Sequence, residues 1–273
     1  MDKLFKRLSL VGVAVLLSTA GNAADLPPPI IEHIPHVPAA APGGFYLRGD
    51  IGYKIYGDPS GSFNDPIVGD LRFQRESVDD TWMVGLGVGY KFNSYLRTDL
   101  TVDYEAPAQV KGYAPCFGCV GGFSTETADI DVWTVMLNGY LDIGTWNNIT
   151  PYVGGGIGAA WVNTSGQTSV NPGVGGTTTT TYDGSNSEWN FAWALMAGAS
   201  YAVTPNFAID AGYRYKDLGE AKTVRLHDVG TGSTRIKYED LTAHEFRLGA
   251  RYTFNTAAPA PSFLHSGPIS SNF

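Results

Sequence analysis

Long hydrophobic runs are absent from this sequence. Apart from residues 8–17, no segment approaches the eighteen consecutive apolar residues that a membrane-spanning helix needs, and that run is itself too short. A helical membrane protein is therefore excluded. Basic side chains are also outnumbered, because 18 Lys and Arg residues stand against 26 Asp and Glu residues, and the formal net charge is -8. Nucleic-acid binding needs a basic surface. We therefore expect no nucleic-acid partner.

Residues that favour helices are few relative to glycine and the aromatic residues. The chain holds 34 Gly, 15 Tyr, 13 Phe and 6 Trp, which favours an all-β fold. Its N-terminus has the pattern of an export signal: a basic end, the apolar run 8–17 and a small-residue site ending at Ala23. We expect cleavage after residue 23, which would change the net charge to about -10. Residues 24–43 are rich in proline and predict an extended leader.

The segment 242–254 shows the pattern on which the fold prediction depends. Its even positions are mostly apolar and end in Tyr252 and Phe254, whereas its odd positions are charged or small. A strand points successive side chains to opposite faces, so one face is apolar and the other is charged. A soluble sandwich would put the apolar face in its core, whereas an outer-membrane barrel would turn it toward lipid.

Seven further segments alternate in the same way. The eight predicted strands are 44–56, 80–92, 95–105, 130–143, 150–163, 188–203, 207–216 and 242–254. The connections between them alternate between long loops (57–78, 106–128, 164–187 and 217–240) and short turns. Short periplasmic turns and long surface loops are the layout of an outer-membrane barrel. We therefore expect an eight-stranded antiparallel transmembrane up-and-down β-barrel over residues 44–254.

The two faces also argue against the sandwich. Trp82, Trp161, Trp189 and Trp193 all lie in the apolar set, which suits a lipid-facing surface. Charges of both signs recur on the opposite face, where they can neutralise one another, since unpaired buried charge is costly. The expected interior network is Arg48, Asp50, Arg97, Asp99, Asp103, Asp210, Arg214, Glu245, Arg247 and Arg251.

Three stretches resemble small outer-membrane barrels, the group that includes the OmpA transmembrane domain, opacity-like surface antigens and porin-like major proteins of alphaproteobacteria. They are PYVGGGIGAAW (151–161), SYAVTPNFAIDAGYRYKDLG (200–219) and HEFRLGARYTF (244–254), and the expected mature start ADLPPP is similar to the alphaproteobacterial group. The resemblance implies that the barrel-assembly machinery reads the closing aromatic, here Phe254. OmpA carries a peptidoglycan-binding domain after its barrel, but the tail at 255–273 is too short to form one.

Few residues suggest chemistry. Cys116 and Cys119 form a Cys-x-x-Cys pair without a second pair or a nearby histidine, so a local disulfide of an oxidising compartment is favoured over a redox or zinc site. His33 and His36 fall in the leader with no third ligand. His227 lies in a loop, and His244 falls on the expected lipid face. We therefore expect no enzyme, no cofactor and no metal.

The expected role is structural: an outer-membrane barrel that supports the envelope and displays surface loops as an antigen. A narrow porin-like channel for ions or small solutes is the alternative, although eight strands leave an interior that side chains can fill. An adhesin or a lipid-modifying enzyme is a third class. The expected partners are outer-membrane lipids, lipopolysaccharide, the barrel-assembly machinery, and host or environmental ligands at the loops.

Overall fold

The computed structural model describes residues 43–65, 68–228 and 232–254. The expected export signal at 1–23, the leader at 24–43 except its last residue, and the tail at 255–273 lie outside this part of the chain. So do His33 and His36. No helix among the described residues is long and apolar enough to span a membrane.

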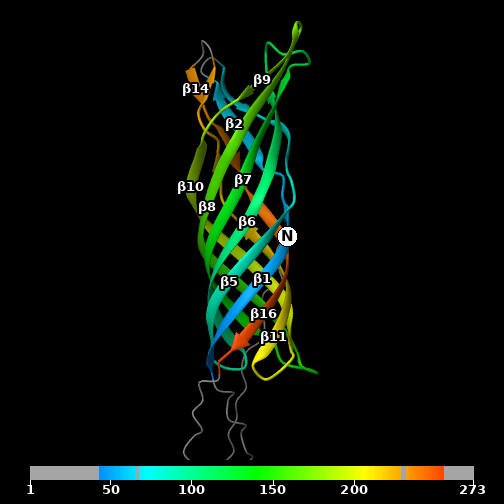
Figure 1. The fold of residues 1–273 in the computed structure, drawn as a ribbon, viewed down its shortest axis with the longest axis vertical. Coiled ribbons are helices and arrows are strands. Elements are labelled where there is room, and N and C mark those ends of the chain that lie inside the picture. Colours follow the sequence, from blue (N-terminus) through cyan, green and yellow to red (C-terminus); the bar gives the residue numbers. More distant parts are fainter. Residues whose placement is uncertain (1–42, 66–67, 229–231, 255–273) are drawn as a thin grey trace, which may run out of the picture. The chain divides into compact units, whose positions relative to one another are not determined.

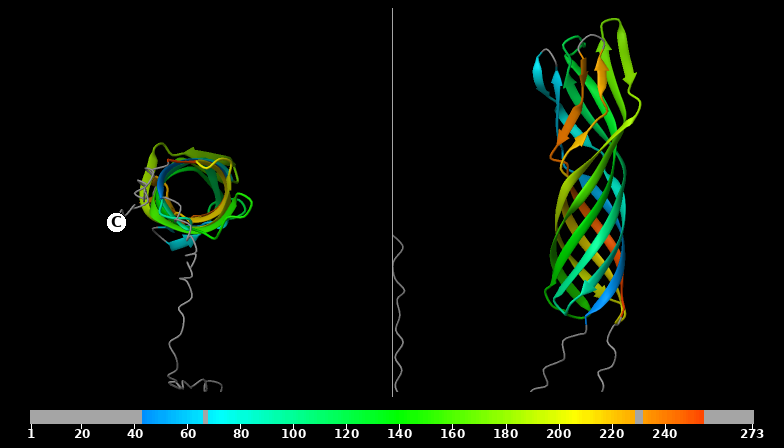
Figure 2. Two further views of the ribbon diagram at one scale, coloured as in Figure 1. Left: turned by 90° about the horizontal axis from the view of Figure 1, so that it is seen from below. Right: turned by 90° about the vertical axis from the view of Figure 1, so that its left-hand side faces the viewer.

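Eight long strands form a closed antiparallel ring (Figures 1 and 2). Around the ring they are β1 (Gly44–Tyr56), β5 (Thr81–Lys91), β6 (Leu96–Pro115), β7 (Phe123–Asp142), β8 (Ile149–Gly173), β10 (Ser185–Ala202), β11 (Phe207–Asp217) and β16 (Thr242–Thr253). β16 closes the ring on β1, with Leu248 opposite Ile51. The all-β, eight-stranded barrel predicted from the sequence is confirmed. At their short-turn ends the strands differ from the predicted bounds by one residue at most.

The register shows how the strands are staggered. Paired residues lead from Tyr104 on β6 through β7 and β8 to Trp189 on β10. In the other direction, through β5, β1, β16 and β11, they lead from Tyr104 to Ala199, also on β10. The two paths end ten residues apart, and this difference is the shear of the barrel. A row of paired residues therefore climbs from strand to strand instead of circling at one height.

The lower part of the ring is apolar outside and charged inside. Leu86, Ile51 and Leu248 are all more than half exposed, although they are hydrophobic. Outward aromatic side chains gather near the short turns, where Phe45 contacts Tyr90 and Tyr252 contacts Phe254. An apolar band edged by aromatic residues is the lipid-facing surface of an outer-membrane barrel.

The prediction of four long loops is wrong, because most of each loop is paired strand. β6 and β7 run for 20 residues each and β8 for 25. The shorter strands are β2 (Ser60–Asp65), β3 (Gly69–Arg72), β4 (Gln74–Val78), β9 (Gly176–Thr181), β12 (Ala221–Lys222), β13 (Leu226–Asp228), β14 (Gly232–Thr234) and β15 (Ile236–Glu239). The polar composition suggested loops, but threonine is β-branched and suits strands. We call the described parts of 57–80, 106–131, 162–187 and 218–241 the extension.

The extension has the opposite polarity to the lower ring. A register shift in β6 buries both Glu105 and Ala106, which reverses the phase of that strand. Beyond it most of the buried side chains are apolar, such as Val110 and Ile130, although Glu126 is also buried there. The outward positions become polar, and Asp131 lies on β7 just above Trp133. The barrel wall therefore leaves the apolar layer near Trp133 and continues as a water-facing structure with an apolar core.

Candidate functional site: the charged barrel interior

Among the described residues, fourteen charged side chains are buried inside the lower ring. All ten residues of the expected network are among them, and each is at most 9% exposed. The network expected from the sequence omits Lys54, Glu105, Asp142 and Lys216, although Lys54, Glu105 and Lys216 share the inward faces of predicted members. The period-two alternation was the signal that could have found them. Seven cations (Arg48, Lys54, Arg97, Arg214, Lys216, Arg247 and Arg251) thus face seven anions (Asp50, Asp99, Asp103, Glu105, Asp142, Asp210 and Glu245).

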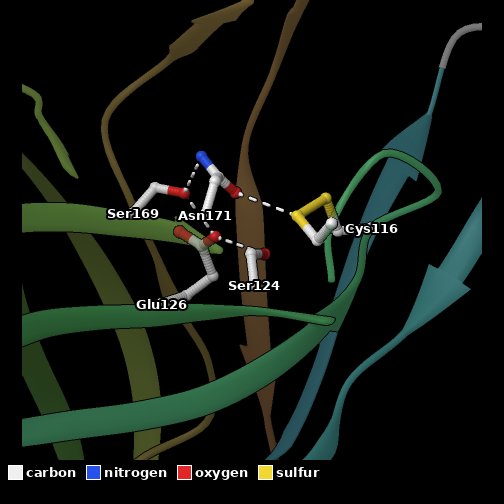
Figure 3. Close-up of a disulfide and its surroundings, with 6 residues drawn as sticks. Cys116, Ser124, Glu126, Ser169 and Asn171 are labelled. Carbon is white, nitrogen blue, oxygen red and sulfur yellow. Dashed lines mark hydrogen bonds between the residues drawn. A yellow bond between two sulfur atoms is a disulfide. The ribbon is translucent and has the colours of Figure 1, made fainter. Parts of the chain in front are cut away.

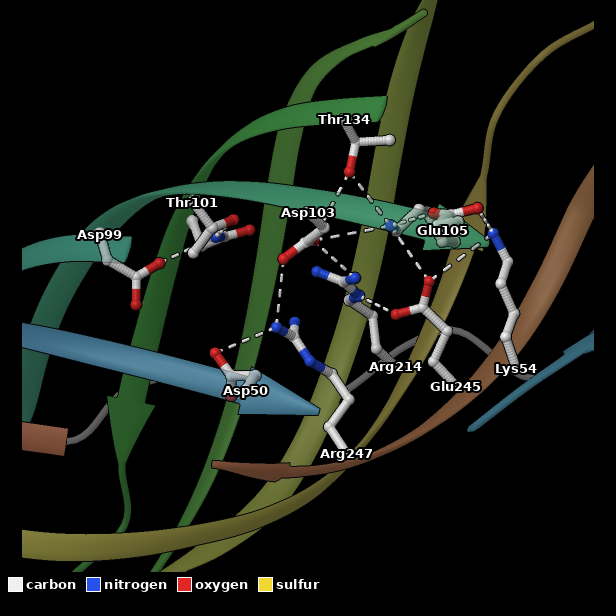
Figure 4. A network of polar contacts seen from close by, with 12 residues as sticks. Asp50, Lys54, Asp99, Thr101, Asp103, Glu105, Thr134, Arg214, Glu245 and Arg247 are labelled. Carbon is white, nitrogen blue, oxygen red and sulfur yellow. Dashed lines mark hydrogen bonds and ion pairs between the residues drawn. The ribbon is translucent and has the colours of Figure 1, made fainter. Parts of the chain in front are cut away.

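The densest part of the network lies next to the extension. Figure 4 shows its side chains. Lys216 Nζ lies 2.9 Å from Glu105 Oε1 and 3.0 Å from Glu245 Oε1. Lys54 donates to the other oxygen of Glu105. Arg214 Nη2 donates to Asp103 Oδ2 at 2.7 Å, and its Nε donates to Glu245. These charge-assisted contacts leave each of the six ions with an oppositely charged partner.

Several of these contacts cross the lumen. β6 and β11 are four places apart in the ring of eight, so they lie on opposite walls. The Arg214–Asp103 and Lys216–Glu105 ion pairs join these two strands. Arg247 on β16 adds a contact to Asp103 at 3.4 Å. The side chains therefore span the barrel instead of lining a channel wall.

A second group fills the middle of the ring. The Arg48 guanidinium donates to Asp50 at 2.7 Å and to Asp99 Oδ2 at 2.9 Å. It also donates to the Tyr140 hydroxyl at 2.8 Å. Asp99 accepts further hydrogen bonds from Tyr46 and from the Asn138 amide. Arg48 thus links β1 to β6 and β7 through a buried polar cluster.

The third group closes the end near the short turns. Arg97 donates through Nε to Asp142 at 3.0 Å. Its guanidinium carbon lies 4.3 Å and 4.6 Å from the ring centroids of Tyr140 and Tyr152, which are cation–π distances. Arg251 lies 3.4 Å from Asp210, and Ser200 donates a hydrogen bond to the same carboxylate.

Glycines on the inward face make room for these side chains. A Cβ at Gly85 would lie 2.2 Å from Asp103 Oδ1, and one at Gly249 would lie 2.3 Å from Asp50 Oδ1. Both carboxylates form ion pairs with arginines, so moving either carboxylate aside would break an ion pair. The interior cavity beside Arg48 and Tyr140 measures about 10 Å³, which is room for one water molecule at most.

The cysteine pair lies at the tip of β6 and β7 (Figure 3). A disulfide joins Cys116 to Cys119, with 5.3 Å between their Cα atoms. Nearby, the buried Glu126 carboxylate accepts hydrogen bonds from Ser124 at 2.8 Å and Ser169 at 2.6 Å. Burial raises the pKa of Glu126, because none of its hydrogen-bond donors carries a positive charge.

The remaining predicted positions lie outside the network. His244 faces outward, and its Nδ1 lies 2.6 Å from the Tyr213 hydroxyl. His227 belongs to β13. Phe254 directly follows β16, and its amide donates to the carbonyl of Phe45 at 2.8 Å. Phe254 is therefore tied to the first strand at the seam of the barrel.

Comparison with known proteins agrees with this architecture. The family model described as outer membrane protein beta-barrel domain matches residues 11–254. An uncharacterized protein of Brucella suis is 34% identical, over 86% of this chain and 93% of its own length. The outer membrane protein PagN of Salmonella typhimurium is 30% identical, over 79% and 92%. The structure of OprG from Pseudomonas aeruginosa matches with a TM-score of 0.52 and 16% identity, over 78% of this chain and 97% of that one.

The fold and its two surfaces define an integral β-barrel of the Gram-negative outer membrane. The chain belongs to the outer membrane protein β-barrel domain family.

Proposed function

We propose that this protein is a closed structural barrel of the outer membrane, which supports the envelope and presents the extension at the cell surface as an antigen. The observation that carries the proposal is the set of ion pairs across the lumen, above all Arg214–Asp103 and Lys216–Glu105. They occupy the space that a solute would need. The short turns then face the periplasm and the extension faces outward, as in other outer-membrane barrels.

A narrow channel is the second candidate, because the interior is polar along the whole apolar band. Water and small ions could pass if some ion pairs opened. Liposome swelling separates the two roles. Vesicles that contain the refolded protein should swell in a pentose solution no faster than empty vesicles, and they should retain a potassium gradient. Swelling or potassium loss in proportion to the protein content would favour the channel.

The proposed role is not enzymatic, and neither a cofactor nor a metal takes part in it. His244 is engaged with Tyr213 on the outward face, away from the buried carboxylates. Lipid A isolated from cells that express the protein should keep its acylation pattern. A changed pattern would instead support a lipid-modifying enzyme. In this proposal the partners are outer-membrane lipids and lipopolysaccharide, with the barrel-assembly machinery acting at Phe254. An adhesin role would add a ligand at the extension.

A further inference from the structure

One sector of the outer wall carries an unusual arrangement of side chains. Trp133 on β7, Trp161 on β8 and Trp189 on β10 are paired in register and form one row across three strands. Trp189 is 67% exposed, as is Phe191 two residues further along β10. The next outward row above the tryptophans is polar and consists of Asp131, Asn163 and Ser187.

The shear of the barrel lifts this row out of the apolar layer. A shear of ten over eight strands displaces a row of paired residues by slightly more than one residue per strand. Over the three steps from β6 to β10 the row is therefore displaced along the strands by roughly four residues. The residue of β10 that is level with Tyr104 is therefore Trp193, and Trp189 lies roughly 10 Å above it. Trp133 contacts Tyr104, and with Trp82 these outward aromatic residues belong to the outer aromatic girdle, at the upper edge of the apolar band. The tryptophan row begins in this girdle and rises from there into the layer of lipid headgroups.

The polar row above the tryptophans is pre-arranged for hydrogen bonding. Asn163 Nδ2 donates to Asp131 Oδ1 at 2.8 Å, so the two side chains hold each other in place. The carboxylate retains free acceptor positions, and the amide retains a donor and an acceptor. A sugar-binding surface combines such polar groups with an aromatic face. The C–H face of a pyranose ring packs on an indole, and its hydroxyl groups require donors and acceptors at the rim.

We propose that the outward face of β7, β8 and β10 binds the saccharide headgroup of the outer-leaflet glycolipid, lipopolysaccharide. We call Trp161, Trp189, Phe191, Asp131 and Asn163 the saccharide platform. The platform is continuous with the lipid-facing girdle at Trp133, so a glycolipid whose acyl chains lie along Val135 and Leu137 brings its sugars against it. A soluble glycan has no such anchor, and this continuity favours a sugar of the same membrane.

The test uses the full-length mature protein refolded in detergent micelles. The probes are deacylated lipopolysaccharide, which keeps the sugars, and lipid A without core sugars. Affinities are measured by isothermal titration for the wild type, Trp189→Ala, Asn163→Ala and Trp189→Phe. Trp82→Ala is the matched control, since Trp82 is an outward girdle tryptophan on β5, away from the platform. Heat-modifiable migration on a gel checks the fold of each variant.

The wild type should bind deacylated lipopolysaccharide. Trp189→Ala and Asn163→Ala should each weaken that affinity roughly three- to tenfold. The affinities of Trp189→Phe and Trp82→Ala for deacylated lipopolysaccharide should stay within twofold of the wild-type affinity. All variants should bind lipid A with the same affinity as the wild type. If Trp189→Ala does not fold, Asn163→Ala decides the matter.

Three results would overturn the proposal. One is an unchanged affinity in Asn163→Ala or in folded Trp189→Ala. Another is an equal loss in Trp82→Ala, which would indicate a general girdle effect. The third is displacement of deacylated lipopolysaccharide by an equal concentration of maltoheptaose, which would indicate an unselective sugar surface instead of a glycolipid site.

Discussion

At the scale of single residues, the interior depends on charges that are both buried and paired. Arg214 is the clearest case, because it is fully buried and its two partners, Asp103 and Glu245, come from two other strands. Breaking such a pair leaves an uncompensated charge in a poorly solvated space, and this costs far more than the pair itself contributes.

We therefore expect Arg214→Ala to destabilise the barrel by about 3–5 kcal/mol. The measurement is equilibrium unfolding in urea with the protein reconstituted in lipid vesicles. Lys237→Ala is the control: Lys237 forms ion pairs with Glu220 and Glu239 on the exposed surface of the extension, and exposed pairs contribute little. Equal unfolding midpoints for the two variants would contradict this account of the interior.

Glu126 gives a prediction about pH. Its pKa in the folded protein lies above its ordinary value of 4.5, so the folded state takes up the proton first as the pH falls. The stability of the upper β6–β8 region should therefore rise as the pH falls from above the folded pKa toward 4.5. Glu126→Gln should remove this dependence and slow hydrogen exchange of the upper β7 amides at neutral pH. Faster exchange in Glu126→Gln at neutral pH would contradict the assignment.

Residue patterns predicted the interior well where the alternation was regular. The period of two placed Arg48, Asp50 and Asp103 inside because each shares a face with glycines or other charges. It could not show which charges pair, because the Arg214–Asp103 contact joins strands whose residues are 111 positions apart. Contacts across a lumen depend on ring closure and shear, and neither can be read from one strand.

At the scale of strands, the extension was the part that composition misrepresented. Thr, Ser and Gly in 164–187 suggested a loop, yet β8 and β9 pair from Thr168–Thr181 to Gly173–Gly176. The membrane part was predictable because lipid imposes an apolar outer face. The extension meets water on its outer face and has an apolar interior, so its pattern is the reverse and its phase changes at the β6 register shift.

The β8–β9 hairpin should be dispensable for the barrel. Tyr182 N donates to Gln167 O at 2.8 Å, so residues 168–181 can be replaced by an Asn-Gly turn without moving the strands below. Among the described residues β9 pairs only with β8, and the replaced part of β8 pairs with β7 only at Thr168–Val170, within the extension. The shortened protein should therefore fold in detergent with an unchanged heat-modifiable shift. If this variant fails to fold although no residue of the lower ring is changed, the extension is needed to support the membrane part.

At the scale of the whole barrel, two parts of one wall have different surroundings. The lower ring spans the membrane and holds seven cations and seven anions in its interior, and the extension continues the same strands into water. The proposed saccharide platform lies where the two meet.

The central claim is that the lumen is closed, and single-channel recording in planar bilayers tests it most directly. The wild type should insert without conductance steps, and heat-modifiable migration of the protein recovered from the same bilayer preparation should show that the inserted barrel was folded. Wild-type steps of reproducible size that Arg97→Ala abolishes or alters would contradict the closed barrel and establish a channel.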